Sequence, residues 1–217
     1  LSGRTHALRM SARVSLSEAG ERLAKGAIGI LPTDTLYGFV ASALSADAVD
    51  RLYQARGRNE NKPCIVLLAD SDDIARFGRI LSLEENALLG TVWPGAVSVI
   101  LSGFSDTFSY LHRGTGTIAF RVPDVLALRD MLRISGPIIA PSANPEGMKP
   151  AETIEEAEAY FGDRADFFVD GGKLSGLPST VVRLENDRFT VVRPGTAEDV
   201  LRIEHLTKVF PNGTVAL

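Results

Sequence analysis

The sequence predicts a single α/β domain in which helices pack on the faces of a sheet that mixes parallel and antiparallel strands. Helical patterns alternate with short apolar runs, as they do in proteins built on such a sheet. Two apolar runs, residues 179–185 and 189–195, are separated by a short polar turn and predict a hairpin, so the sheet is not purely parallel. The 217 residues are 45% hydrophobic and 23% charged, which is an ordinary globular composition.

The individual elements follow from capping residues and apolar periodicity. Ser15 and Glu18 form a capping-box pattern that starts a helix, and the next apolar run, AIGIL, predicts a buried strand ending at Pro32. Ser45 starts a second helix. The later expectations are a buried strand over 64–69, short helices ending at Gly78 and Gly90, strands over 96–101 and 117–123, a helix begun by Asp124, a strand running into a loop over 137–144 and a capped helix over 153–162.

Composition restricts both the domain organisation and the classes of function. We expect an N-terminal arm over residues 1–14, either disordered or forming an extra edge element, one domain over 15–203, and a C-terminal tail over 204–217. The formal net charge of −4 predicts no bulk attraction to nucleic acid or to an anionic membrane. Cys64 is the single cysteine, which fits a reducing compartment such as the cytoplasm, and no apolar run is long enough to span a membrane.

Several kinds of catalytic site have no support in the sequence. It contains no phosphate-binding loop of the G-x-x-x-x-G-K-[ST] type, no G-x-S-x-G elbow, no H-E-x-x-H helix and no cysteine pair. Its three histidines are scattered and have no spacing typical of metal ligands. We therefore expect neither a covalent nucleophile nor a protein-held metal.

Polar segments near the ends of predicted strands remain as candidates, because open α/β sheets bind ligands at the carboxyl ends of their strands. The first, a predicted loop over residues 31–40, offers hydroxyls and a carboxylate: Thr33, Asp34, Thr35 and Tyr37. A turn in which these side chains cap their own backbone is the alternative. The second, residues 55–64, has three cations that suit phosphate or carboxylate: Arg56, Arg58 and Lys62. A solvated basic loop is the alternative there.

Three further segments place polar groups at the ends of, or within, apolar strands. Arg121 interrupts an apolar strand and must meet either a bound anion or an internal acid. Ser142 and Asn144 are two residues apart, so in an extended chain they share one face, although a simple turn is also possible. Ser179 opens a strand of the hairpin and Arg193 closes the other.

In this order the motifs resemble the YrdC-like family. They are P-T-D-T-x-Y-G, R-G-R with K-P, W-P-G, R-V-P, P-S-A-N, S-T-V and R-P-G, and they cover about residues 15–200. The resemblance implies a twisted mixed sheet with a concave basic groove. It also implies an activity, the conversion of L-threonine, bicarbonate and ATP, with its Mg²⁺, into threonylcarbamoyl-AMP and pyrophosphate. Other proteins then transfer the threonylcarbamoyl group to tRNA, so contact with tRNA itself would be indirect.

The resemblance also implies roles for individual residues. The threonine site would consist of Thr33, Thr35, Tyr37, Arg121, Ser142 and Ser179. The ATP site would consist of Arg56, Arg58, Lys62, Thr117, Asn144 and Arg193. Within these sets, the catalytic groups would be Arg56, Arg58, Ser142 and Asn144. No residue is expected to bind a metal directly, and the protein would be a monomer or a homodimer.

Two departures from the family pattern leave alternatives open. Arg56 replaces the usual lysine of K-x-R, and Lys149-Pro150-Ala151 replaces the usual S-P-T. Both changes leave room for a YciO-like paralogue with weaker or altered activity, or without this activity. An RNA-binding protein could use the same cations on an RNA backbone, although the acidic composition argues against it. A carbamoyltransferase domain that works with a partner is a third alternative.

Overall fold

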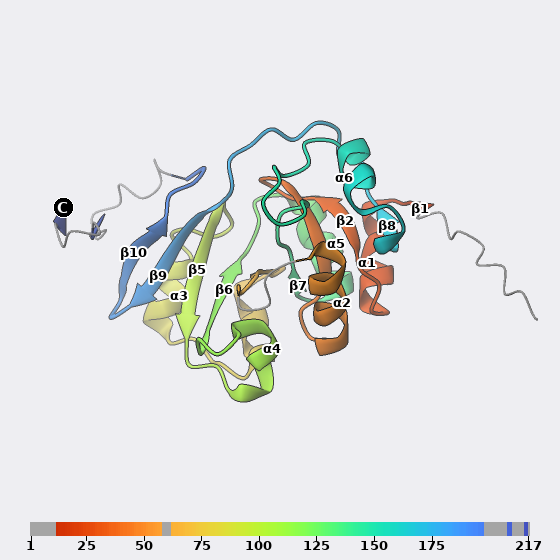
Figure 1. The fold of residues 1–217 in the computed structure, drawn as a ribbon. Coiled ribbons are helices and arrows are strands. Elements are labelled where there is room, and N and C mark those ends of the chain that lie inside the picture. The colour runs from red at the N-terminus through yellow and green to blue at the C-terminus, as the bar shows by residue number, and fades with distance from the viewer. Residues whose placement is uncertain (1–11, 58–61, 198–207, 210–214, 217) are drawn as a thin grey trace, which may run out of the picture.

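The structure, a computed structural model, describes residues 12–57, 62–197, 208–209 and 215–216, and its main feature is one mixed sheet (Figure 1). The strand order is β1-β8-β2-β3-β7-β4-β6-β5-β9-β10. The strands are β1 (Ala12–Arg13), β2 (Gly29–Pro32), β3 (Tyr37–Ser42), β4 (Ile65–Leu67), β5 (Val97–Ser102), β6 (Thr117–Arg121), β7 (Ile138–Ile139), β8 (Phe167–Phe168), β9 (Thr180–Glu185) and β10 (Arg188–Arg193). Parallel pairs such as β4 with β6 and antiparallel pairs such as β5 with β6 both occur, which confirms the predicted mixed sheet.

The helices begin mostly at the predicted capping residues. The Oγ of Ser15 accepts a hydrogen bond from the backbone N–H of Glu18, and Ser45 caps the next helix in the same way. These side chains satisfy backbone donors that have no partner within the helix. The helices are α1 (Leu16–Ala24), α2 (Ala46–Arg56), α3 (Leu83–Leu89), α4 (Ser109–His112), α5 (Leu126–Ser135) and α6 (Ile154–Phe161), with short 3₁₀ turns η1 (Ser71–Phe77), η2 (Asp106–Phe108) and η3 (Gly162–Arg164).

The predicted hairpin is confirmed as β9 and β10. Asn186 and Asp187 form its two-residue turn with φ angles of 51° and 57°. Such a turn requires φ above zero at both central positions, and asparagine and aspartate tolerate this better than most residues. Local turn chemistry therefore determines this corner of the sheet.

Three local predictions need correction. Asp124 does not cap α5, because the helix begins at Leu126 after Val125, and no side chain caps it. Residues 31–40 are not one loop, because the chain turns back over 33–36 and pairs with β2 as β3. The helix predicted before Gly78 is a 3₁₀ turn, which Asp70 begins by accepting the backbone N–H of Asp72. The first two errors have a common cause, since antiparallel pairing and helix start depend on where the neighbouring strands lie.

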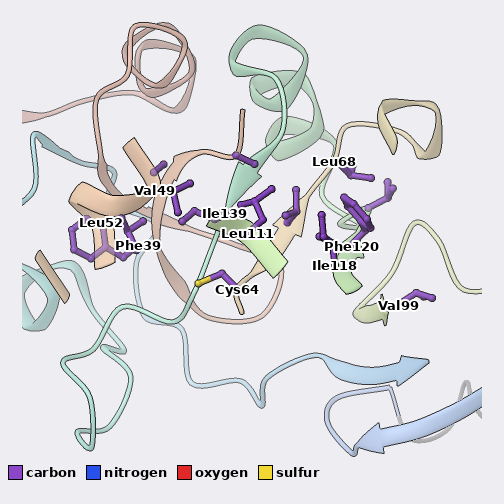
Figure 2. Packing of buried hydrophobic residues seen from close by; sticks show 14 of the residues in the cluster. Phe39, Val49, Leu52, Cys64, Leu68, Val99, Leu111, Ile118, Phe120 and Ile139 are labelled. Carbon is purple, nitrogen blue, oxygen red and sulfur yellow. The ribbon is translucent and has the colours of Figure 1, made fainter. Parts of the chain in front are cut away.

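One face of the sheet is covered along most of its width by helices. Alternate side chains of the strands point into this main core, where they meet α2, α3, α4, α6 and η1. Figure 2 shows residues of this layer from α2 and from several strands, including Val49, Phe39, Ile139, Phe120 and Val99. The layer is continuous from one half of the sheet to the other, so it fixes the relative positions of the strands.

The opposite face is covered over only one half of the sheet. Helices α1 and α5 pack together over β8, β2, β3, β7 and β4, and bury Leu31, Val40 and Leu67 beneath them. No described helix contributes to a core over the same face of β6, β5, β9 and β10. The expectation of two covered faces therefore holds for half of the sheet only, and the uncovered half forms the floor of a cavity.

The described residues near the two ends of the chain can be compared with the predicted arm and tail. Ala12 and Arg13 form β1, an edge strand parallel to β8, and the guanidinium of Arg13 pairs with Glu155 and Glu158 of α6. Residues 1–11 of the expected arm, and most of the expected tail, lie outside the described residues. In the part of the chain that the structure describes, no helix has the length and apolarity needed to cross a membrane.

Candidate functional site

A cavity of about 730 Å³ lies on the uncovered half of the sheet. Its floor includes Thr117, Ala119 and Arg121, which alternate along β6, and Ile100 of β5 and Val181 of β9. These residues face away from the main core, because side chains on a strand alternate between the two faces. The sequence placed the site at strand ends, and the structure extends it across the face of the sheet. The difference arises because no helix among the described residues covers this part of that face.

The wall nearest β2 and β3 is the turn formed by residues 33–36. The Oγ1 of Thr33 donates to the carbonyl of Leu36 at 2.7 Å and accepts the backbone N–H groups of Thr35 and Leu36, both at 3.2 Å. The hydroxyls of Thr33 and Thr35 also lie 3.2 Å apart. The expectation that this turn caps its own backbone is thus confirmed for Thr33. Because Thr33, Thr35 and Leu36 also line the cavity, the turn presents a rigid edge to a ligand.

Arg121 is a buried cation in contact with this turn. Its Nη2 lies 3.0 Å from Oδ1 of Asp34, and its Nη1 donates to the Oγ1 of Thr35 at 3.3 Å. Burial lowers the pKa of Arg121 and Asp34 opposes that effect, whereas burial raises the pKa of Asp34 and Arg121 opposes it. Within the described residues the Nε of Arg121 has no hydrogen-bond partner. Arg121 therefore meets an internal acid, and it also lines the cavity, where its contact with a bound anion stays a prediction.

A long connection from β8 to β9, residues 170–179, crosses the cavity, and we call it the strap. Tyr37 anchors it, since its hydroxyl donates to the carbonyl of Gly172 at 2.7 Å and accepts the N–H of Gly171 at 2.8 Å. Burial raises the pKa of Tyr37. A Cβ at Gly176 would lie 2.8 Å from the carbonyl oxygen of Thr35, so only glycine allows this approach. The strap therefore closes against the turn through backbone contacts.

The loop after β7 is held from behind by Arg56. Its Nε donates to the carbonyl of Ser142 at 2.9 Å, and its Nη2 donates to Oδ1 of Asn144 at 3.0 Å. Asn144 itself donates to the carbonyls of Pro145 and Met148. Of these three site residues, Ser142 lines the cavity, while Arg56 and Asn144 are buried outside its lining. The guanidinium of Arg56 thus supports the loop that faces the ligand space.

The opposite wall is formed where β9 begins and β10 ends. Arg193 donates through Nη2 to the backbone carbonyl of Ser179 at 2.9 Å, and the hydroxyl of Ser179 lies 2.9 Å from that of Ser98. Burial lowers the pKa of Arg193. Because Arg193 and Ser179 both line the cavity, a cation and a hydroxyl stand side by side on this wall.

The charges on the cavity lining are mainly positive. Arg121, Arg193 and Lys149 are the described basic residues in the lining, against the single acid Glu152. Lys149 pairs with Glu156 at 3.3 Å, and this neighbour raises its pKa. A space of this kind favours anionic ligands such as phosphates and carboxylates.

The structure brings most of the predicted site residues together. Those that line the cavity are Thr33, Thr35, Tyr37, Thr117, Arg121, Ser142, Ser179 and Arg193. Lys62 is exposed and pairs with Glu146 instead of facing the cavity. Arg58 lies outside the described residues. The roles of all these residues toward ligands stay predictions.

Sequence reasoning missed two parts of the site. One is the strap, whose Leu174, Ser175 and Gly176 line the cavity. Its signal is the glycine-rich stretch 171–176, since glycines mark places where backbones approach closely. The other is Ser98, which lies beneath Ser179, and its signal is a single serine within the apolar run AVSVIL.

No described group of three or more histidine, cysteine, aspartate or glutamate side chains could hold a metal ion. Glu152 is the described carboxylate of the cavity lining, and Lys173 lies 3.7 Å from it. A metal that entered with a phosphate ligand would therefore take most of its ligands from phosphate and water.

Comparison with known proteins places the chain in a family. The model for Sua5, YciO and YrdC, described as "Telomere recombination", matches residues 21–195. The threonylcarbamoyl-AMP synthase of Bacillus subtilis is 36% identical over 184 residues, which are 83% of this chain and 53% of that protein. The enzyme of the same name from Halorhodospira halophila is 31% identical over 85% of this chain and 92% of its own length.

Solved structures agree with this placement. The fold is similar to that of Pyrococcus abyssi Sua5 complexed with L-threonine, with a TM-score of 0.74, 26% identity, and coverage of 91% of this chain and 62% of that one. Escherichia coli YciO shares the fold with a TM-score of 0.70 at 24% identity, over 83% of this chain and 89% of that one. The chain spans about half the length of the first curated relatives that it matches. By the match of its sequence and of its fold, the chain belongs to the Sua5–YciO–YrdC family.

Proposed function

We propose that this protein is an L-threonylcarbamoyladenylate synthase, a nucleotidyltransferase that acts in the cytoplasm. L-threonine, bicarbonate and ATP would give threonylcarbamoyl-AMP, pyrophosphate and water. The observation that carries the proposal is a cavity in which cations and hydroxyls from five separate segments converge, in a chain whose relatives bear this enzyme's name. Other proteins would transfer the product's threonylcarbamoyl group to tRNA.

The proposed reaction needs no nucleophile from the protein. The threonine amine and bicarbonate form a carbamate with loss of water, and a carbamate oxygen attacks the α-phosphorus of ATP. A new P–O bond forms, the bond between the α- and β-phosphates breaks, and pyrophosphate carries away the electron pair. Because the reactants are anions, their mutual repulsion is the main obstacle. Fixed cations and accurate positioning lower such a barrier.

The charges on the cavity walls fit this requirement. Arg121 lies beside the Thr35 hydroxyl, where it can hold a carboxylate, and Arg193 stands on the opposite wall beside Ser179, where it can face phosphate. The magnesium of ATP would be held by the phosphates, with Glu152 as the available carboxylate of the lining. The hydroxyls of Thr33 and Thr117 lie on the same lining and can complete the contacts with amino acid and nucleotide.

Calorimetric titration tests the proposal directly. L-threonine and L-serine are titrated separately into the protein, with and without a non-hydrolysable ATP analogue. We expect the analogue to tighten threonine binding. Serine should bind more weakly than threonine, because it lacks a methyl group whose burial contributes about 1 kcal/mol to the binding free energy. Threonine-dependent and bicarbonate-dependent release of pyrophosphate from ATP is the matching activity measurement.

Two outcomes would contradict the proposal. Absence of threonine binding with and without the nucleotide would favour a paralogue with a different substrate. Salt-sensitive binding of RNA that ATP and threonine fail to compete would favour use of the cations on an RNA backbone, since such contacts depend on counterion release.

A further inference from the structure

Ser98 is a polar residue between two apolar residues of strand β5. Its neighbours in β5 are Val97 and Val99, and it is 0% exposed to solvent. Buried hydroxyls are nearly always hydrogen-bonded, so a serine at such a position has a specific partner. In the described part of the chain, the partner of its side chain is the hydroxyl of Ser179.

The register of the sheet places Ser98 directly beneath the cavity. Val97 and Val99 point into the main core, so Ser98 points to the opposite face, where the cavity lies. In the parallel pairing of β5 with β9, Ser98 is opposite Val181, which lines the cavity. Ser98 itself is not part of the lining. It is therefore a supporting residue and not a candidate ligand contact.

Ser179 is held from two sides at the edge of the cavity. Its backbone carbonyl accepts the Nη2 of Arg193 at 2.9 Å, and its hydroxyl lies 2.9 Å from the Oγ of Ser98. The first contact fixes the backbone, and the second fixes the rotamer of the side chain. Ser179 is only 2% exposed, so its hydroxyl has few other partners from which to choose.

We infer that Ser98 is a positioning residue, which orients the hydroxyl of Ser179 for the amino-acid substrate. Each hydroxyl has one proton to donate. When Ser98 donates to the oxygen of Ser179, the proton of Ser179 is free to be donated to an oxygen atom in the cavity. A carboxylate of an amino acid is such an acceptor. The inference rests on the proposed function, because it takes Ser179 to contact the amino acid.

A double-mutant cycle on threonine binding tests the inference. The variants are Ser98→Ala, Ser179→Ala and the double variant, titrated with threonine in the presence of a saturating ATP analogue. We expect Ser98→Ala to weaken threonine binding about 3- to 10-fold, which corresponds to one neutral hydrogen bond. The double variant should bind threonine as Ser179→Ala does, within about 2-fold, because Ser98 acts only through Ser179.

Controls separate a positioning role from a general effect on folding. Ser102→Ala removes an exposed hydroxyl from the same face of the same strand and should leave threonine affinity unchanged. The affinity of Ser98→Ala for the ATP analogue should also stay unchanged. Ser98→Cys keeps nearly the same volume with a weaker donor, so its threonine affinity should lie between those of wild type and Ser98→Ala.

The inference is overturned by unchanged threonine affinity in Ser98→Ala, by independent, multiplying losses in the double variant, or by an equal loss of affinity for the ATP analogue. Failure of the proposed function gives a different result, because the wild-type protein itself would then show no threonine binding.

Discussion

Arg121 links the turn over residues 33–36 to the floor of the cavity. It is 4% exposed, and it contacts both Asp34 and Thr35, which belong to a turn 86 residues earlier in the chain. A planar guanidinium can span two such partners, whereas an ammonium group acts as a point charge. Arg121 therefore fixes the distance between the turn and the floor of the cavity.

Arg121→Lys should weaken threonine binding about 10-fold or more while the positive charge is retained. The lysine amine cannot contact Asp34, Thr35 and a bound carboxylate with the geometry of a guanidinium, and a hydrogen bond to a charged group is worth about 1.5–3 kcal/mol. Calorimetry with threonine measures the loss. Arg183→Lys, at an exposed position on β9, is the control and should bind threonine as the wild type does. Equal affinities in the two variants would contradict a direct role for Arg121.

Arg56 shows how a residue can matter to the site without reaching the ligand space. Its guanidinium donates to Ser142 and Asn144, and it is 5% exposed. The sequence identified it as a cation near a strand, and the structure shows that it supports the loop after β7. Its role toward the phosphates of ATP stays a prediction.

At the scale of elements, the strap and the turn over residues 33–36 lie against each other at one edge of the cavity. They meet through the hydroxyl of Tyr37 and through the close approach of Gly176 to Thr35. Both contacts use backbone atoms, which leaves little freedom for side-chain substitution. The phenol of Tyr37 therefore anchors the beginning of the strap, at Gly171 and Gly172.

Tyr37→Phe should lower the free energy of unfolding by about 1–3 kcal/mol, because it removes the two hydrogen bonds between the phenol and the strap. Hydrogen exchange should become faster at the amide of Gly171, which donates to the phenol. Tyr110→Phe is the matched control, since the hydroxyl of Tyr110 donates to Ala43, away from the strap. If both variants left exchange in the strap unchanged, Tyr37 would not be its anchor.

The phenol of Tyr37 should also make the stability of the fold depend on pH. Burial raises the pKa of Tyr37 above its ordinary value of 10.0, so the folded state favours the neutral phenol. Its stabilising contribution is complete below pH 10.0 and is lost as the pH rises through the raised pKa. The stability difference between wild type and Tyr37→Phe should therefore shrink in alkaline solution. Urea unfolding at neutral and alkaline pH measures it, and a difference that grew above pH 10.0 would contradict the assignment.

At the scale of the whole molecule, the incomplete covering of the sheet creates the site. Helices cover one face over most of the sheet but the other face only over its β8 to β4 half, and the cavity occupies the remainder. The protein thus leaves partly apolar surface open that a ligand would cover. Ligand binding should in consequence stabilise the fold.

Threonine and an ATP analogue, each at about 100 times its dissociation constant, should raise the melting temperature by at least about 5 °C. A single ligand at that concentration stabilises the folded state by about 2.7 kcal/mol, and a chain of this size gains about 2–4 °C per kcal/mol. Scanning calorimetry measures the shift, and Arg121→Lys at the same ligand concentrations should show a smaller one. A shift below about 1 °C at these concentrations would contradict binding of both ligands to the folded protein.

Much of the local structure could be predicted from the sequence because its causes are local. Ser15 and Ser45 cap their helices through bonds to residues three positions later, and Asn186-Asp187 form a turn through their own backbone angles. The mixed sheet followed from these patterns. Asp124 failed as a cap because a helix start also depends on the strand before it.

The candidate site was predicted in part. Thr33, Arg121 and Arg193 were visible as polar residues in apolar surroundings, and the structure places all three on the cavity lining. The strap and Ser98 were not found, because a glycine-rich loop and one buried serine gain meaning only from what lies across the sheet. Lys62 is not part of the cavity lining, and its ion pair with Glu146 joins segments that the sequence cannot place together. Its role toward ATP stays a prediction.

The sequence by itself determined the α/β class, most of the elements and most of the cations and hydroxyls that line the cavity. The tertiary structure alone decided which half of the sheet stays uncovered, and therefore that the site spans a face and not only the strand ends. The physical reason is the separation along the chain over which the interactions act. Caps, turns and side-chain alternation depend on neighbours within a few residues, whereas strand order and helix placement depend on how the whole chain buries its apolar surface.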